Sequence, residues 1–278
     1  MTDRLPMTRG RRLALAIGVP LALIVIGGLA LNEVAYAGQD SYPVHLDVPV
    51  TGGTARVSVD SGNLTVGPGA AGRLRLSGTA HYSLVRSSVT WHQTRSGVTV
   101  DSHCRFLIGQ CSADLTVAIP ASARAVLSDG SGDMTVRGLT GHVSAGAGSG
   151  NVGAYGLSGT ADLGDGSGDI LGAALSGPRV TLSNGSGNIS VTGLTSGYVV
   201  ASDGSGDISL TFTRVPSHVH VTDDSGNVTL ILPPGKTTLY HVNASTSSGN
   251  KVINVPTSSV SHRVITVTDG SGDISITN

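Results

Sequence analysis

The residues of this sequence that are best suited to chemistry are acidic, and they recur at nearly constant spacing. A Ser-Gly-Asp or Ser-Gly-Asn triplet first occurs at Ser61–Asn63 and returns at Ser131–Asp133. From Ser131 it recurs after steps of 18, 18, 19, 19, 20, 23 and 23 residues. Ten Asp residues lie in or beside these triplets: Asp129, Asp133, Asp165, Asp169, Asp203, Asp207, Asp223, Asp224, Asp269 and Asp273.

Two interpretations of the triplets compete. Hard cations such as Ca²⁺ bind clustered oxygens, which makes Asp165, Asp169, Asp203 and Asp207 candidate calcium ligands. Gly-Asp turns are similar to calcium-binding nonapeptide rolls, but those repeat about every nine residues. Here the spacing is 18–20 residues over most of the repeats. Turn formation is the alternative, because Asp and Asn accept hydrogen bonds from nearby backbone groups.

We favour turn formation because Asp and Asn alternate at the third triplet position. This position alternates strictly between the two residue types from Asp133 to Asn227. In a stack of strands about 4.8 Å apart, neighbouring carboxylates would repel by roughly 1 kcal/mol even in water. Interposed Asn amides can donate hydrogen bonds to the carboxylates on either side. Such a ladder needs no metal ion, so we expect no cofactor and keep calcium as the alternative.

Catalytic chemistry finds little support in the sequence. Glycoside hydrolysis needs two carboxyl groups at a defined separation, one with a raised pKa, and exposed Gly-rich turns offer nothing that would raise it. The Gly-x-Ser-x-Gly turn between a strand and a helix is absent. His218 and His220, with His241 or His262, could meet a transition metal, but we interpret them as isolated surface residues. We therefore predict a protein without catalytic residues.

The aliphatic residues keep register with the triplets. Met134 and Val136 follow one triplet, and Val143 and Ala145 come next, with equivalents at the same offsets in later repeats. Each pair alternates with a period of two, which indicates a strand with one buried face. Because one such unit cannot bury its own apolar face, stacking is required. We predict an all-β, parallel β-helix-like solenoid of about 18–20 residues per coil; an antiparallel array of hairpins is the alternative.

The composition fits this architecture and excludes other classes. The 278 residues include 40 Gly and only six Tyr, two Phe and one Trp, and 13% are charged. The net charge of −1 gives no electrostatic footprint for nucleic acid. Small aliphatic side chains suit a thin core, and glycine supplies positive φ at sharp corners.

The beginning of the chain predicts a membrane segment. A basic N-terminus at 1–12 precedes an uncharged run at 13–31, which is about the length that spans a bilayer. The positive-inside rule places 1–12 in the cytoplasm and the remainder outside, as a single-pass membrane protein. The sequence Ala35-Tyr36-Ala37 is similar to a signal-peptidase site, so cleavage after Ala37 and secretion is the alternative.

Two regions follow this segment. Residues 42–120 form less regular β layers, with strands expected at Arg56–Val66, Arg73–Thr79, Gly97–Asp101 and Asp114–Ile119, and an excursion from about Ala80 to Ser112. Residues 121–278 form the repeat solenoid. In an exported protein the two cysteines, Cys104 and Cys111, most simply form a disulfide.

The triplets follow an aliphatic strand that ends at proline, Leu115–Pro120. In this combination the sequence, from Tyr42 to Asn278, resembles the DUF4097 family of bacterial β-strand-repeat proteins, which are described as adhesins. The resemblance implies an exported or membrane-anchored β-solenoid with no established enzymatic activity. It supplies no catalytic residues.

We therefore expect a non-enzymatic, extracytoplasmic adhesin or cell-envelope interaction module. One alternative is a polysaccharide-processing β-helix enzyme, although Arg137, Arg179 and Arg214 fall in turns rather than in one row. The other is an accessory or sensor subunit of an envelope-stress system. We expect Ile274–Asn278 to be an exposed edge strand that docks a second copy or an envelope partner.

Overall fold

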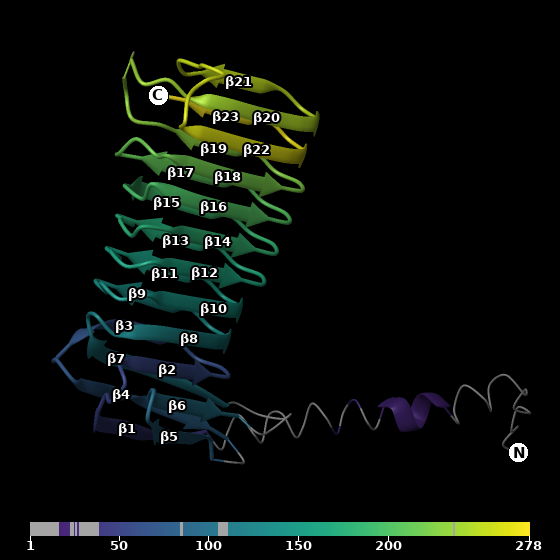
Figure 1. Cartoon of the computed structure of the whole chain (residues 1–278). Helices are drawn as coiled ribbons and strands as arrows, with labels where there is room; N and C mark the ends of the chain where they lie inside the picture. Colours follow the sequence, from purple (N-terminus) through teal and green to yellow (C-terminus); the bar gives the residue numbers. More distant parts are fainter. Residues whose placement is uncertain are drawn as a thin grey trace, which may run out of the picture.

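The computed structural model describes residues 17–22, 25, 27, 39–83, 86–104, 111–235 and 237–278. These residues form a β-solenoid in which 23 strands build two facing sheets, stacked rung upon rung (Figure 1). The chain enters at one end of the stack, and most later repeats extend it toward the other end.

The two sheets are named A and B. Sheet A contains, in spatial order, β1 (Asp40–Pro49), β4 (Arg73–Tyr82), β7 (Cys111–Pro120), β3 (Leu64–Gly69), β9 (Met134–Arg137), β11 (Val152–Tyr155), β13 (Ile170–Ala173), β15 (Ile189–Leu194), β17 (Ile208–Phe212), β19 (Val228–Ile231), β23 (Ile274–Thr277) and β21 (Lys251–Asn254). Sheet B contains β5 (Ser88–Thr94), β6 (Gly97–His103), β2 (Thr54–Val59), β8 (Arg124–Ser131), β10 (Val143–Ser149), β12 (Ala161–Asp165), β14 (Val180–Asn184), β16 (Tyr198–Asp203), β18 (His218–Asp223), β22 (Val264–Ser271) and β20 (His241–Ser248).

Each repeat contributes one strand to each sheet, and parallel pairing places equivalent residues side by side. In sheet B, Val143 on β10 pairs with Ala161 on β12, which in turn pairs with Val180 on β14. All three are fully buried, and the alternate residues face outward, as the period of two predicts. The solenoid prediction is confirmed, and the hairpin alternative is wrong for the repeats because neighbouring repeats run parallel.

The triplet glycines form a column of their own at one corner. Gly150 and Gly187 have φ values of +110° and +120°, which L residues other than glycine rarely adopt. A Cβ atom added to Gly187 would also overlap the carbonyl oxygen of Gly168 on the preceding rung. Glycine is therefore required twice, once for the turn and once for the close approach of successive rungs.

The first part of the chain departs from the parallel stack. β1 and β4, β4 and β7, and β5 and β6 are antiparallel pairs. The predicted strand Arg56–Val66 is two strands, β2 and β3, separated by the first triplet. The predicted excursion Ala80–Ser112 is only partly external, because β5 and β6 within it join the edge of sheet B.

The predicted disulfide is confirmed between Cys104 and Cys111, whose Cα atoms lie 5.7 Å apart. It joins the residue after β6 in sheet B to the first residue of β7 in sheet A. The bond therefore ties the two sheets together near the entry end.

Replacing both cysteines by alanine should lower the free energy of unfolding by about 2–3 kcal/mol, because the short closed loop then gains conformational freedom in the unfolded chain. Urea unfolding of the oxidised protein and of the double alanine variant measures the difference. A reducing agent should destabilise the native protein by a similar amount and leave the variant unchanged. Equal stability of the oxidised protein and the variant would contradict the prediction.

The end of the repeat array corrects one expectation. The last strand, β23, lies between β19 and β21 and is not an edge strand. Although β20 and β21 come before β22 and β23 in the chain, they lie farther out in the stack. β22 and β23 lie between them and the preceding rung, which contains β18 and β19 (Figure 1). Among the described residues, β20 and β21 are the edge strands at this end, because no further rung pairs with them.

Most of the predicted membrane segment 13–31, the basic segment 1–12 and the cleavage position after Ala37 lie outside the described residues. Residues 17–22 are helical. Among the residues that are described, no helix combines the length and the apolar character that crossing a membrane requires.

Candidate functional site

The third triplet position forms an outer column of alternating carboxylates and amides along one corner of the solenoid. In spatial order the column begins with Asp114, which is not part of a triplet, and continues with Asn63, Asp133, Asn151, Asp169, Asn188, Asp207, Asn227, Asp273 and Asn250. The sequence breaks the alternation after Asn227, where Asn250 precedes Asp273. Insertion of the last rung restores it, because Asp273 then lies between Asn227 and Asn250.

Hydrogen bonds run continuously along this outer column. The backbone N–H and the Nδ2 of Asn188 donate to Oδ1 of Asp169, at 2.8 and 3.2 Å. The Oδ1 of Asn188 accepts the backbone N–H of Asp207 at 3.0 Å. The ladder prediction is confirmed with one correction. Each Asn amide donates to one neighbouring carboxylate, and, except in the terminal Asn250, its oxygen accepts the backbone N–H of the other neighbour.

Replacing Asn188 by Asp should lower the free energy of unfolding by about 1–2 kcal/mol at neutral pH, because one donor is lost and three carboxylates become adjacent. The loss should shrink in acid, because protonation of carboxylates removes their mutual repulsion. Thermal unfolding of both proteins, at neutral pH and in acid, measures the loss of stability. Asn278→Asp, at the exposed end of the chain, is the control for the added charge and should change little. A pH-independent loss would contradict the electrostatic cause.

A second, inner column runs beside the first, at the last core-facing position of the sheet B strands. It contains five Asp residues that are between 1% and 8% exposed: Asp129, Asp165, Asp203, Asp223 and Asp269. In each, Oδ1 accepts the backbone N–H of the Ser two residues later, at 3.0 to 3.3 Å. In each, the buried Oδ2 has no hydrogen-bond partner among the described residues.

Burial changes the acidity of this column. It raises the pKa of Asp129 and Asp223 from the ordinary 3.8 to about 6. Burial also raises the pKa of Asp165 and Asp203. Asp223 lies between Asp203 and Asp269 on adjacent rungs, and both charges raise its pKa further. Burial therefore makes Asp129, Asp165, Asp203 and Asp223 weaker acids than carboxyl groups in water.

Two other residues in the column reveal which bond a protonated carboxyl would make. Asn184 lies between Asp165 and Asp203, and its Nδ2 donates to the carbonyl oxygen of Gly168 on the preceding rung, at 2.9 Å. Thr246, beside Asp269, donates from Oγ1 to the carbonyl oxygen of Gly272 at 3.2 Å. This position therefore suits a hydrogen-bond donor, which Asp becomes only when it is protonated.

The structure divides the four predicted calcium ligands between the two columns. Asp165 and Asp203 are buried in the inner column, and Asp169 and Asp207 lie in the outer ladder. The Oδ1 atoms of Asp169 and Asp207 already accept two hydrogen bonds each. Within the part of the chain that the structure describes, no group of three or more His, Cys, Asp or Glu side chains is placed to hold a metal ion.

The histidines do not converge either. His218 and His241 each pair with Val264, so two strand spacings, about 9.6 Å, separate them. His218 stacks on Tyr198, with ring centroids 5.7 Å apart. The guanidinium of Arg179 also lies over the Tyr198 ring, 4.0 Å from its centre. These contacts stabilise the outer surface of sheet B and leave no shared metal position.

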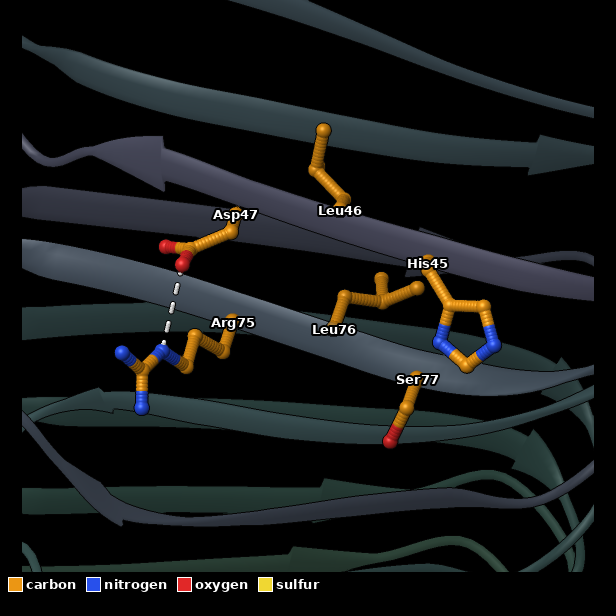
Figure 2. A pocket seen from close by; sticks show the side chains of 6 residues that line it. All are labelled: His45, Leu46, Asp47, Arg75, Leu76 and Ser77. Carbon is orange, nitrogen blue, oxygen red and sulfur yellow. Dashed lines mark hydrogen bonds and ion pairs between the residues drawn. The ribbon is translucent and has the colours of Figure 1, made fainter.

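A surface depression at the entry end brings together a Ser, a His and an Asp (Figure 2). It is lined by His45, Leu46, Asp47, Arg75, Leu76 and Ser77. Figure 2 shows Asp47 and Arg75 on one side, and His45 and Ser77 on the other.

This combination is not a catalytic triad. Arg73 and Arg75 donate to the Asp47 carboxylate at 2.7 and 3.3 Å, and the bond from Arg73 lowers its pKa. No hydrogen bond joins His45 to Ser77 or to Asp47 within the described residues. Asp47 therefore forms an ion pair instead of orienting the histidine.

The match to a protein family agrees with this architecture. The family model described as Toastrack DUF4097 matches residues 44–278. The search of curated proteins found no match. Among solved structures, the chain is similar to a protein from Clostridium sporogenes ATCC 15579 described as a "putative cell adhesion protein", with 11% identity and a TM-score of 0.33 over 85% of this chain and 99% of the other.

Proposed function

The chain belongs to the Toastrack DUF4097 family, and from this premise we propose that it is a non-enzymatic adhesion or interaction module of the cell envelope. The buried inner carboxyls support a non-enzymatic role because substrate cannot reach them. The outer carboxylates are occupied by the ladder.

One observation carries the adhesive role: both outer faces present columns of hydroxyl groups. On sheet A the column is Ser190, Ser209, Thr229 and Ser275. On sheet B it is Ser183, Ser202, Thr222 and Thr268. Strand pairing fixes the hydroxyls about 4.8 Å apart on a rigid surface. Such an array suits an extended polar ligand, such as an envelope glycan, that bonds to several rungs at once.

A glycan array tests the adhesive role. Binding of a glycan should weaken when Ser202 and Thr222 are replaced by Ala and Val, and the matched pair Ser209→Ala and Thr229→Val reports whether sheet A is used instead. Absence of any glycan binding would contradict the proposal. Release of reducing sugar from a bound polysaccharide would favour the alternative of a polysaccharide-processing enzyme. Neighbouring genes of an envelope-stress system would favour the accessory or sensor alternative.

We also propose that the segment 13–31 anchors the protein, with 1–12 in the cytoplasm and the solenoid outside. The uncharged run and the preceding arginines support this topology. N-terminal sequencing of the mature protein tests it. A mature chain that begins after Ala37 would replace the anchor with secretion.

A partner is proposed for the far end, now at β20 and β21 instead of the final strand. Leu239, Val252, Ile253 and Val260 are between 42% and 82% exposed there. An unpaired edge beside apolar side chains is a template for pairing. Sedimentation of the protein and of a Val252→Lys variant tests self-association. A monomer in both cases would reject a second copy as the partner.

A further inference from the structure

The entry end of the solenoid carries the single Trp of the chain in an unusual position. Trp91 lies on β5, the edge strand of sheet B, and its side chain is 45% exposed. It pairs with Val100, which is fully buried, so Trp91 is on the core-facing side of the strand. It is exposed because no further rung of the described residues covers this end.

Other apolar side chains lie on the same terminal rung as Trp91, on the edge strands of the two sheets. Tyr42, Val44 and Leu46 lie on the core-facing side of β1, since Tyr42 and Leu46 pair with the buried Ala80 and Leu76. Together with Val89 on β5 they are partly buried against the core. We call these five residues (Tyr42, Val44, Leu46, Val89 and Trp91) the apolar mouth.

Arginines lie at the rim of the apolar mouth, where Arg86 also lies near the carboxylate of Asp40. The guanidinium of Arg86 lies 4.0 Å from the centre of the Tyr42 ring. Arg95, in the turn between β5 and β6, is exposed. The nearby Asp47 is neutralised by Arg73 and Arg75. An aromatic and aliphatic surface with arginines at its edge matches the water–lipid interface, where Trp and Tyr place their rings among headgroups and Arg binds phosphate.

The connection of the chain identifies the occupant of this surface. β1 starts at Asp40, and the proposed anchor ends at Leu31. The eight intervening residues span at most about 29 Å when fully extended. A solenoid held by this tether must therefore keep its entry end beside the bilayer. The far end lies at the other end of the stack (Figure 1).

We propose that the apolar mouth rests on the outer leaflet of the membrane, with Trp91 at the level of the lipid headgroups. This inference depends on the proposed anchor. It adds that the solenoid is docked on the bilayer by its first rung and does not swing freely on its tether. The terminal rung then gains the cover that no protein segment among the described residues provides.

The far end also exposes apolar side chains, but it differs from the mouth because a lysine occupies a core-facing position there. Lys251 occupies a core-facing position on β21, because it pairs with the buried Ile274. Its Nζ reaches across the open end to the carbonyl oxygen of Ala244 on β20, at 3.3 Å. A lysine at a core-facing position keeps a hydrated charge at that end, which opposes its burial in lipid.

Fluorescence of the full chain in vesicles tests the proposal, because Trp91 is its only Trp. The vesicles contain phosphatidylcholine and phosphatidylglycerol, with or without bromine on the upper acyl chain, which quenches Trp at short range. We expect emission to shift to the blue and to fall by roughly half in brominated vesicles. The matched control is Trp91→Tyr combined with Val260→Trp, which moves the probe to the far end and should abolish quenching.

Flotation of the same vesicles separates two failures. A protein that floats with the vesicles while Trp91 remains unquenched would overturn the docking of the mouth and leave the anchor intact. Equal quenching at Trp91 and at the far-end probe would also overturn it, because the solenoid would then lack a preferred contact. A protein that does not float would overturn the anchor itself, which is the proposed topology.

Discussion

Replacing Asp223 by Asn should raise the free energy of unfolding by about 1–3 kcal/mol at neutral pH and change it little near pH 4. The new amide can donate to the carbonyl oxygen of Gly206 as the Asn184 amide donates to Gly168. At neutral pH the native carboxylate cannot donate and its Oδ2 has no partner. Near pH 4 the native carboxyl is protonated in the fold, so the variant loses its advantage.

The sign of this pH dependence follows from the raised pKa. The folded chain keeps the Asp223 proton up to about pH 6, whereas the ordinary value is 3.8. Below the ordinary value both states hold the proton and the stabilisation is complete. As pH rises through 6 the folded chain also loses the proton, and the stabilisation is lost. Asp129 follows the same course, so the native protein should become less stable between about pH 4 and pH 7.

The urea midpoint at a series of pH values measures the effect. Asp224→Asn is the matched control, because it removes the same charge one residue away on an exposed side chain. It should shift stability by less than about 0.5 kcal/mol. Equal stabilisation by both variants would indicate a general charge effect and would contradict the role of the inner column.

Replacing Gly187 by Ala should destabilise the solenoid by about 3–5 kcal/mol. The φ of +120° strains any L side chain, and the added Cβ would overlap the Gly168 carbonyl. The new Cβ would meet backbone atoms of Gly168, which cannot rotate away as a side chain can, so the two rungs must move apart. That separation would also lengthen the ladder hydrogen bonds of the adjacent Asn188.

Two control variants divide this loss into its causes. Gly156 has φ +63° with no atom within 4 Å of an added Cβ, so Gly156→Ala isolates backbone strain and should cost about 1 kcal/mol. On the next rung, Ala174 occupies the position equivalent to Gly156 with a φ of 55°, so an alanine is tolerated in this turn. At Gly146 the nearest atom to an added Cβ is 4.0 Å away, so Gly146→Ala should be nearly neutral. Thermal unfolding of the three variants should rank them in this order, and a Gly187→Ala loss no larger than that of Gly156→Ala would contradict the stacking argument.

The repeat region was predicted well because each repeat contains, in its own residues, the pattern that determines its strands and turns. The period of two at Met134 and Val136, and the triplet glycines, fix strand, turn and stacking together. The region 42–120 was predicted less well. β5 lacks a clear alternation of buried and exposed residues, because it is an edge strand with an open inner face. β1 does alternate, at Tyr42, Val44 and Leu46, and this period of two was a signal that the prediction missed. The pairing of β1 with β4 is long-range and antiparallel, and no local pattern encodes it, whereas β5 and β6 form a hairpin that turns at Arg95 and Ser96.

Of the two columns in the candidate site, only the outer one was predicted from the sequence. The Asp and Asn alternation was visible in the sequence, and so was its role as a ladder. The inner column was grouped with the exposed turns, because Asp129 and Asp133 stand in the same short segment. The signal that could have separated them is register: Asp129 lies two residues after the core residue Leu127, so strand alternation places it inside.

By itself, the sequence determined that this chain is a stack of thin, parallel, glycine-cornered rungs, because nearest-neighbour repeats carry that information locally. Only the tertiary structure decided which rung neighbours which. It inserted β22 and β23 beneath β20 and β21, brought Asp273 between two Asn residues, and took the last strand away from the edge. The physical reason is that pairing between rungs depends on which edges remain unsatisfied once the whole chain is folded, and that is a property of the assembled stack.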